Sequence, residues 1–143
     1  MNRGSASPED VADRLHSAAI HVLRRVRKED EASGLGPARL SALSVVIFGG
    51  PLTLGELAAA EQVRPPTMTR IVDGLVRDGL VRKQTGGDRR TIVIRATARG
   101  RRLLQRARQR RIAVLAERLR EVGDDKLALL DHAAELMEAA SRS

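Results

Sequence analysis

Two short stretches of this chain concentrate arginine with threonine, proline or glycine. Residues 64–70 read Arg-Pro-Pro-Thr-Met-Thr-Arg, and residues 85–90 read Thr-Gly-Gly-Asp-Arg-Arg. Short hydroxyls and a proline ring can approach base edges or a thymine methyl, and arginine can bind guanine or phosphate. Paired arginines on a slim turn can enter a minor groove, where the negative potential is focused. The candidate DNA contacts are therefore Arg64, Pro66, Thr67, Thr69, Arg70, Gly87, Asp88, Arg89 and Arg90.

Asp88 is out of place beside a polyanion unless it orients a cationic side chain. Arg90 follows two residues later on the same predicted turn. A charge-assisted pair between the two would fix the direction of the arginine, and this is the pairing we predict. The alternative is an exposed polar turn without a function.

The excess of positive over negative charge lies in one segment of the chain. Residues 64–111 hold fifteen Arg or Lys and three Asp, a local charge of +12. Because the whole chain carries +8, the remaining residues carry −4. A general bias toward arginine would not spare both flanks, so the distribution favours one surface that faces a polyanion.

The composition excludes several classes of protein. The chain has no cysteine, which rules out disulfides, thiolate metal sites and thiol redox sensing. Phe48 is its one aromatic residue, whereas single-stranded nucleic acid binding relies on aromatic stacking. No apolar run approaches the length of a membrane span, and the N-terminus lacks the apolar core of a signal peptide. We therefore predict a cytoplasmic protein with no membrane association.

No arrangement of residues indicates catalysis or a resident cofactor. We find no Ser-His-Asp spacing, no glycine-rich phosphate loop and no carboxylate pair, so we predict that the chain is not an enzyme and holds no cofactor. His16 and His21 are about 140° apart around a helix, which does not form a chelating pair. His132 lies on the last predicted helix; a metal site shared with a partner chain is the alternative to packing or surface histidines, and we predict no metal.

The elements that must position the candidate contacts span residues 37–97. Helical spacing predicts helices over 37–48, 55–61 and 66–77, the second capped by Thr53 with Glu56. Strands are predicted at 52–54, 80–84 and 91–96, with Gly86 and Gly87 in the turn and Gly79 ending the third helix. The predicted buried residues are Leu40, Leu43, Ile47, Phe48, Leu54, Leu57, Ala58, Met68, Ile71, Val72, Leu75 and Val76.

The flanks of this core are amphipathic helices with apolar stripes. The first starts at Ser7 and Pro8, a long one starts at Thr97, and the last follows Gly123. Their apolar residues exceed what a small core can cover, which indicates a partner chain. The stripes comprise Val11, Leu15, Ala18, Val22 and Val26, then Leu103, Leu104, Ala107, Ile112, Leu115 and Leu119, and finally Leu127, Leu130, Ala134 and Met137.

The predicted fold is mostly α with a small β-hairpin, in a single domain over residues 1–143. A winged helix-turn-helix DNA-binding core (37–97) is flanked by N- and C-terminal dimerisation helices (8–31 and 98–143).

Five motifs together make the chain resemble the MarR family of winged helix-turn-helix transcriptional regulators. They are the runs 54–58 (LGELA), 67–75 (TMTRIVDGL), 79–81 (GLV), 88–90 (DRR) and 97–100 (TARG). The resemblance implies that the helix over 66–77 reads the major groove, and that Arg90 enters the minor groove, held by Asp88. It also implies a triangular homodimer, and repression that small phenolic or lipophilic ligands often relieve.

Some residues depart from the family pattern. Pro66 stands where a small polar residue is frequent, and Ala96 replaces a common leucine. The absence of cysteine removes the family's peroxide-sensing chemistry, and one phenylalanine does not support an aromatic-lined drug pocket.

The sequence thus predicts a homodimeric, sequence-specific regulator of transcription, a repressor that binds a pseudo-palindromic double-stranded operator. Release by a small-molecule effector is an open element of this prediction, and its binding residues are unknown. One alternative is a low-specificity architectural DNA binder, which would gain affinity through counterion release without base readout. The other is a winged-helix module that binds protein, which would show little DNA affinity at physiological salt.

Overall fold

Helices dominate the chain because its apolar residues are aliphatic and recur at helical spacing. The computed structural model describes residues 6–88 and 90–142. Its helices are α1 (Pro8–Val26), the 3-10 helix η1 (Arg27–Ser33), α2 (Pro37–Gly49), α3 (Leu54–Ala60), α4 (Pro65–Arg77), α5 (Ala98–Leu119) and α6 (Asp124–Ser141). The strands are β1 (Leu52–Thr53), β2 (Val81–Thr85) and β3 (Ile92–Ala96). The predicted fold class, mostly α with a small antiparallel sheet, is confirmed.

Local capping signals explain where several helices begin. Thr53 precedes α3, and its hydroxyl accepts the backbone N–H of Glu56 at 3.2 Å. The Glu56 carboxylate in turn accepts the backbone N–H of Thr53 at 2.8 Å, which completes the predicted capping box. Ser7 and Asp10 form the same reciprocal pair at the start of α1.

The core lies between α2, α3, α4 and the inner face of the sheet. Most of the predicted core residues are buried, with Leu43, Leu57, Met68 and Leu75 fully enclosed. Their spacing of three and four residues places them on one face of each helix, so the apolar stripe of each helix is buried away from water. Ile94 of β3 closes the core from the sheet side.

Two predicted core residues are instead exposed. Phe48 has 76% of its surface exposed, because the inward face of α2 is formed by Ala42, Leu43 and Val46, and Phe48 lies about 200° around the helix from Val46. Val76 is 38% exposed, one position beyond the buried Leu75 of α4. The prediction for Phe48 was wrong because hydrophobicity alone does not say which face of α2 is buried. The prediction for Val76 was wrong because this residue lies at the edge of the buried stripe of α4.

The sheet has β3 at its centre, in the order β1-β3-β2. β2 and β3 form the predicted antiparallel hairpin, with Val81 opposite Ala96 and Thr85 opposite Ile92. β1 adds two residues to the other edge, where Leu52 lies opposite Ile94. The helical core and the wing are therefore joined through one central strand.

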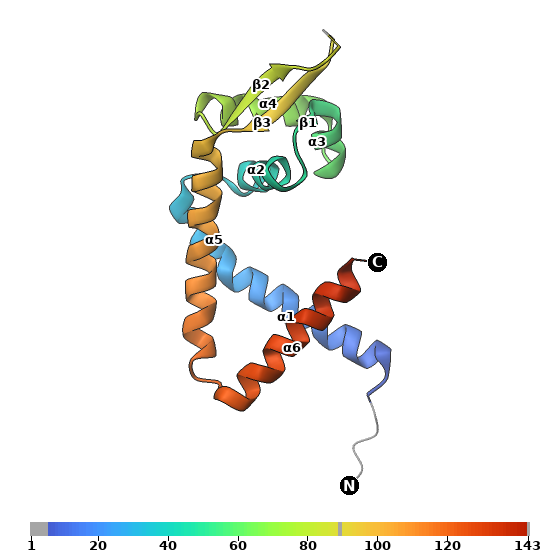
Figure 1. Ribbon diagram of the computed structural model, residues 1–143, viewed down its shortest axis with the longest axis vertical. Helices are drawn as coiled ribbons and strands as arrows, with labels where there is room; N and C mark the ends of the chain where they lie inside the picture. The colour runs from blue at the N-terminus through green and yellow to red at the C-terminus, as the bar shows by residue number, and fades with distance from the viewer. Residues whose placement is uncertain (1–5, 89, 143) are drawn as a thin grey trace.

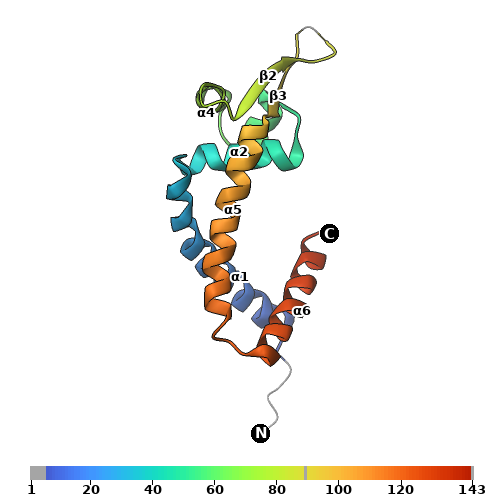
Figure 2. The ribbon, with the colours of Figure 1, turned by 60° about the vertical axis from the view of Figure 1, so that its left-hand side comes forward.

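α1, α5 and α6 extend the molecule beyond this core. Figure 1 shows the winged core at one end, the long α5 leading away from it, and α6 starting at the far end of α5. The first helix is shorter than the predicted 8–31, because the chain tightens into η1 after Val26 and turns at Gly34, whose φ is +74°. Seen from a second direction, α6 stands apart from the winged core (Figure 2).

Candidate nucleic-acid interface

The first turn of α4 is the exposed end of the helix that packs at the centre of the core. Arg64, Pro66, Thr67 and Arg70 are all exposed there, while Met68 between them is fully buried. The buried methionine fixes the rotation of α4, so the neighbouring side chains point outward as a group. This arrangement matches the end of a recognition helix that enters a major groove.

The two prolines change what this helix end offers to a phosphate. An ordinary helix presents several free N–H groups at its N-terminus, which bind anions. The first two residues of α4 are Pro65 and Pro66, which have no N–H, so Thr67 supplies the first one. The Thr69 hydroxyl donates to the carbonyl of Pro65 at 3.0 Å and keeps its acceptor capacity. Contacts at this end therefore depend on side chains more than on backbone N–H groups.

The wing places Asp88 and Arg90 at the tip of the hairpin, both exposed. The Asp88 carboxylate accepts the backbone N–H of Arg90 at 3.3 Å. Within residues 6–88 and 90–142 no ion pair joins Asp88 to the Arg90 guanidinium, so the predicted charge-assisted pair is not the contact that forms. Because a short carboxylate two residues upstream reaches the backbone more easily than a long side chain, Asp88 shapes the turn and leaves the guanidinium free to extend.

Arg89 at the wing tip, also a predicted contact, lies outside the described residues. Gly87 is exposed, and a Cβ there would meet no neighbour. Gly86 has a different role, since a Cβ there would lie 3.3 Å from the carbonyl oxygen of Thr91, whose close approach lets Gly86 N–H donate to that oxygen at 2.7 Å. Neither glycine has the positive φ that turn glycines often adopt.

An ion pair that the sequence reasoning missed ties the wing to α4. Lys83 on β2 donates to the Asp73 carboxylate of α4 at 2.8 Å, with both side chains partly exposed. The pair joins the two surfaces that would touch DNA. A lysine and an aspartate ten residues apart carry no sequence signal for such pairing, because it depends on how β2 crosses α4.

A hydrogen-bonded junction connects the DNA-facing core to α5. The Thr97 hydroxyl donates to the carbonyl of Gly79 at 2.6 Å and accepts the N–H of Gly100 at 3.1 Å. The Thr97 N–H donates to the Leu80 carbonyl at 3.0 Å. Gly100 is buried so closely against Leu80 that a Cβ would lie 2.1 Å from that carbonyl oxygen. The end of α4, the start of β2 and the start of α5 are thus held together.

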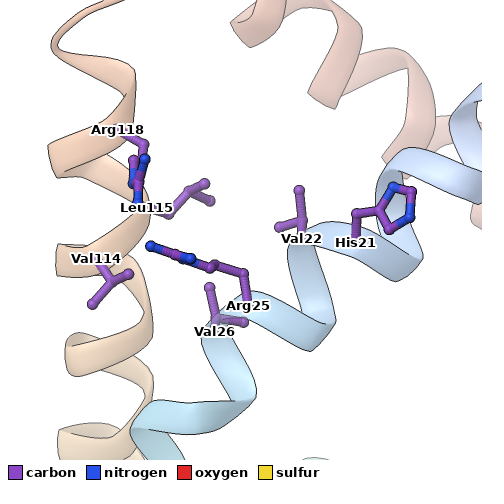
Figure 3. Close-up of a pocket in the computed structure, with 7 residues that line it drawn as sticks. All are labelled: His21, Val22, Arg25, Val26, Val114, Leu115 and Arg118. Carbon is purple, nitrogen blue, oxygen red and sulfur yellow. The ribbon is translucent and has the colours of Figure 1, made fainter.

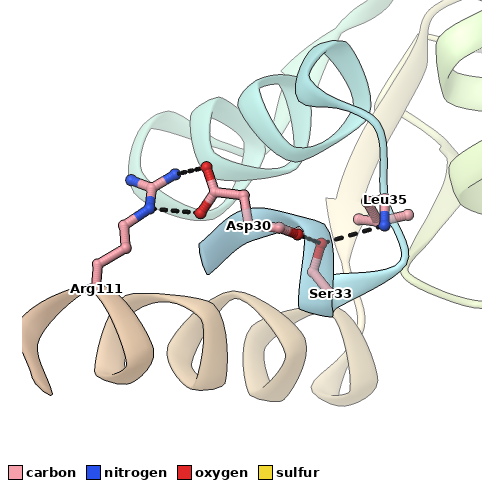
Figure 4. Close-up of polar contacts among 4 residues, drawn as sticks. All are labelled: Asp30, Ser33, Leu35 and Arg111. Carbon is pink, nitrogen blue, oxygen red and sulfur yellow. Dashed lines mark hydrogen bonds and ion pairs between the residues drawn. The ribbon is translucent and has the colours of Figure 1, made fainter. Parts of the chain in front are cut away.

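Farther along α5, a second contact fixes its direction relative to η1. Arg111 binds Asp30 with both ends of its guanidinium fork, Nε to Oδ1 at 2.6 Å and Nη2 to Oδ2 at 2.5 Å (Figure 4). The Asp30 side chain is 14% exposed, which strengthens a bidentate charged contact. Ser33 accepts the N–H of Leu35 at 3.1 Å in the same turn.

A groove runs between α2 and α5, beneath the DNA-facing core. One cavity of about 460 Å³ carries Arg101, Arg108 and Arg111 on one wall and Ile47 and Phe48 on the other. An adjoining cavity of about 640 Å³ extends to η1 and shares Ser44, Leu104 and Arg111. The groove is apolar at its base and cationic along one side.

A third cavity lies between α1 and α5 and is largely apolar. It has a volume of about 360 Å³ and is lined by Val22, Val26, Val114 and Leu115. Figure 3 shows Arg25 extending across it toward α5, while Arg118 reaches down from α5. Its apolar walls leave a gap that α1 and α5 do not fill by themselves.

Within residues 6–88 and 90–142, no three His, Asp or Glu side chains gather in a way that could hold a metal ion. No single helix among them is long and apolar enough to cross a membrane; α1 with η1 reaches the criterion only when combined with α2, across a bend of 94°.

Comparisons with known proteins agree with this geometry. A family model described as the MarR family matches residues 33–91. An HTH-type transcriptional regulator of Mycobacterium leprae is 34% identical over 128 residues, 89% of this chain and 90% of the relative. One from Mycobacterium tuberculosis is 35% identical over 130 residues, 90% of this chain and 91% of the relative.

Solved structures show the same fold. A transcriptional regulator from Thermotoga maritima superposes with a TM-score of 0.82 at 26% identity, covering 94% of this chain and 96% of the other. A MarR family protein from Bacillus stearothermophilus superposes with a TM-score of 0.76 at 23% identity, covering 97% and 100%. The two mycobacterial relatives and the Thermotoga maritima protein are transcriptional regulators rather than enzymes.

Proposed function

The chain belongs to the MarR family of DNA-binding transcriptional regulators, and from that premise we propose that it is a homodimeric repressor of a pseudo-palindromic operator. The observation that carries the proposal is the pairing of two exposed cationic elements on one core: the first turn of α4 and the wing tip with Arg90. The ion pair between Lys83 and Asp73 holds them together. Repression would follow from occupying a promoter, and we place the protein with that DNA in the cytoplasm.

The dimer proposal rests on apolar surface that a single chain leaves in water. α6 has no buried residue, and its exposed apolar side chains include Leu127, Leu130 and Met137. In α1 only Val26 is buried, while Val11, Leu15 and Val22 are exposed. Exposed stripes of this length on two helices mark an interface with another chain. We assign the dimerisation helices to residues 8–31 and 98–143 and the DNA-binding core to residues 37–97.

The effector proposal places a small ligand in the groove between α2 and α5. Arg101 and Arg108 on one wall and Ile47 and Phe48 on the other suit an amphipathic molecule with a carboxylate or another acidic group, while Arg111 at the same wall is already bound by Asp30. Because the groove borders α5, which carries the DNA-facing core, occupancy can change the direction of α5 in the dimer and with it the distance between the two cores.

Selection of bound duplexes from a random pool tests the operator proposal. We expect an inverted repeat with half-sites about one helical turn apart, because two recognition helices must lie in successive major grooves. Repeating the selection with amphipathic acids present tests the effector proposal, since an inducer would reduce recovery of that repeat. Equal recovery of all sequences would indicate an architectural binder. Negligible recovery at physiological salt would indicate a protein-binding module.

We expect Arg90→Ala to weaken operator binding by about 1–3 kcal/mol, because an arginine inserted in a minor groove gains from its focused negative potential. Arg90 is exposed and makes no core contact, so the variant should remain dimeric and melt at the wild-type temperature. Anisotropy titration with the selected duplex measures the effect. Glu135→Ala, at an exposed position on α6, is the control. Unchanged operator affinity in the Arg90 variant would remove the wing from the mechanism.

A further inference from the structure

Gly74 occupies a position in α4 where nothing in the helix itself calls for glycine. It lies in the interior of the helix and is buried. Glycine weakens a helix relative to alanine at such a site, so its presence indicates that something must approach the backbone closely. A Cβ at Gly74 would lie 2.9 Å from Cζ and 2.9 Å from Nε of Arg39. The guanidinium of Arg39 thus rests on the bare surface of α4.

Arg39 also binds the end of the same helix. It lies in the first turn of α2, and its Nη1 donates to Oδ2 of Asp78, the C-cap residue of α4, at 3.3 Å. Gly74 and Asp78 are four residues apart and share one face of α4. The Arg39 side chain of α2 therefore crosses the last turn of α4 and binds the carboxylate at the C-terminal end of that helix.

This contact contributes little to stability when considered alone. The side chains of Arg39 and Asp78 are 40% and 41% exposed, and ion pairs at such sites are weak. Asp78 is unfavourable at a helix C-terminus, where the dipole is negative, and the arginine offsets that charge. The contact defines the position of the Arg39 side chain even though its energy is small. Gly74 sets how closely the arginine can lie against α4, and Asp78 sets where its guanidinium ends.

We propose that Arg39 is a positioning residue for the recognition helix, an inference that rests on the proposed operator binding. From Thr67 to Asp78 α4 rises about 16 Å, so a tilt of about 10° about its C-terminal end moves its DNA-facing end by about 3 Å. Contacts to base edges do not survive a displacement of that size, whereas contacts to phosphates along a flexible backbone do. Arg39 therefore acts on discrimination between sequences, through Gly74 and Asp78, without touching a base.

Two variants test this from opposite sides. Arg39→Ala removes the guanidinium, and Gly74→Ala leaves it charged but displaces it. We expect each to lower operator affinity on the order of five- to tenfold and to leave random-duplex affinity and its salt slope unchanged. Gly74→Ala should keep or raise the melting temperature, since alanine favours helix, so its loss of selectivity would not reflect unfolding. Arg39→Lys, which keeps the charge without the flat fork, should fall between these variants and wild type.

The control is Arg102→Ala, which removes one exposed arginine from α5. It should leave the ratio of operator to random-duplex affinity at the wild-type value. Wild-type affinity for both duplexes, measured alongside, tests the proposed function independently. If Arg39→Ala lowered the affinity for both duplexes equally and made its salt dependence shallower, Arg39 would contact phosphate. That result would overturn the positioning role. Unchanged selectivity in both Arg39→Ala and Gly74→Ala would overturn it as well.

A readout without DNA separates this inference from the operator proposal. Amide hydrogen exchange of the free protein should accelerate in the last turn of α4, residues 74–78, in Arg39→Ala and Gly74→Ala. Exchange in α3 should not change, because neither variant alters the packing of Leu57. If both variants exchanged at the wild-type rate in that turn, the positioning role of Arg39 would be contradicted, even if operator binding itself were absent.

Discussion

A chain truncated after Gly123 is expected to sediment as a monomer and to bind the operator more than about a hundredfold more weakly than the full chain. The truncation removes α6, which buries no residue within its own chain but carries Leu127, Leu130 and Met137 on one face. With the partner lost, each DNA-binding core would hold a single half-site and the gain from bivalent binding would disappear. Sedimentation velocity and operator titration measure the two effects.

A full-length double variant tests the same interface without removing α6. Leu130→Glu with Met137→Glu places charge on the apolar face of α6 and should give the same monomer. Glu135→Ala alters an exposed polar side chain that lies about 80° or more around the helix from each of these apolar residues, and it should leave the dimer intact. The winged core buries its own apolar residues, so it should stay folded in every variant. A dimer in the truncated chain would assign dimerisation to α1 and α5 alone.

Gly100→Ala is expected to destabilise the winged core by roughly 3 kcal/mol or more, and to lower the melting temperature by about 8 °C or more. The added methyl would lie 2.1 Å from the backbone oxygen of Leu80 and 3.2 Å from a methyl of Leu43. A backbone oxygen cannot turn aside as a flexible side chain can, so α5 must move away from β2. Thermal unfolding followed by circular dichroism measures the loss.

The matched control is Gly55→Ala in α3, where a Cβ would meet no neighbour within 4 Å. Alanine favours helix at that site, so this variant should be as stable as wild type or slightly more stable. Operator affinity of the Gly100 variant, measured well below its melting temperature, should also fall, because the junction orients the recognition helix. A melting temperature equal to wild type would mean that the junction yields without cost.

Sequence reasoning succeeded where a few neighbouring residues decide the outcome. The box formed by Thr53 and Glu56 starts α3 as predicted, since both hydrogen bonds lie within one turn. The stripe of Met68, Val72 and Leu75 is buried as predicted, since a spacing of three or four residues fixes one helix face. The helix order and the hairpin followed from these local signals.

Contacts that depend on the exact geometry of a turn, or on how separate elements pack, were not predicted correctly. Phe48 was assigned to the core on hydrophobicity, but only the packing of α2 decides which face is covered. Asp88 was paired with the side chain of Arg90, whereas the turn geometry brings the backbone N–H closer. Lys83 with Asp73, and Arg39 with Gly74, meet only once β2, α2 and α4 have packed together.

Because of the junction at Thr97 and Gly100, the DNA-facing core and α5 move together as one rigid unit. α5 has 22 residues and is therefore about 33 Å long. If the far end of α5 pivots by about 5° in the dimer, the core at its other end moves by about 3 Å, close to the 3.4 Å rise of one base pair. The proposed repressor would then measure the spacing between two half-sites to within a single base pair, and a ligand that shifts the pivot would change which spacing it accepts.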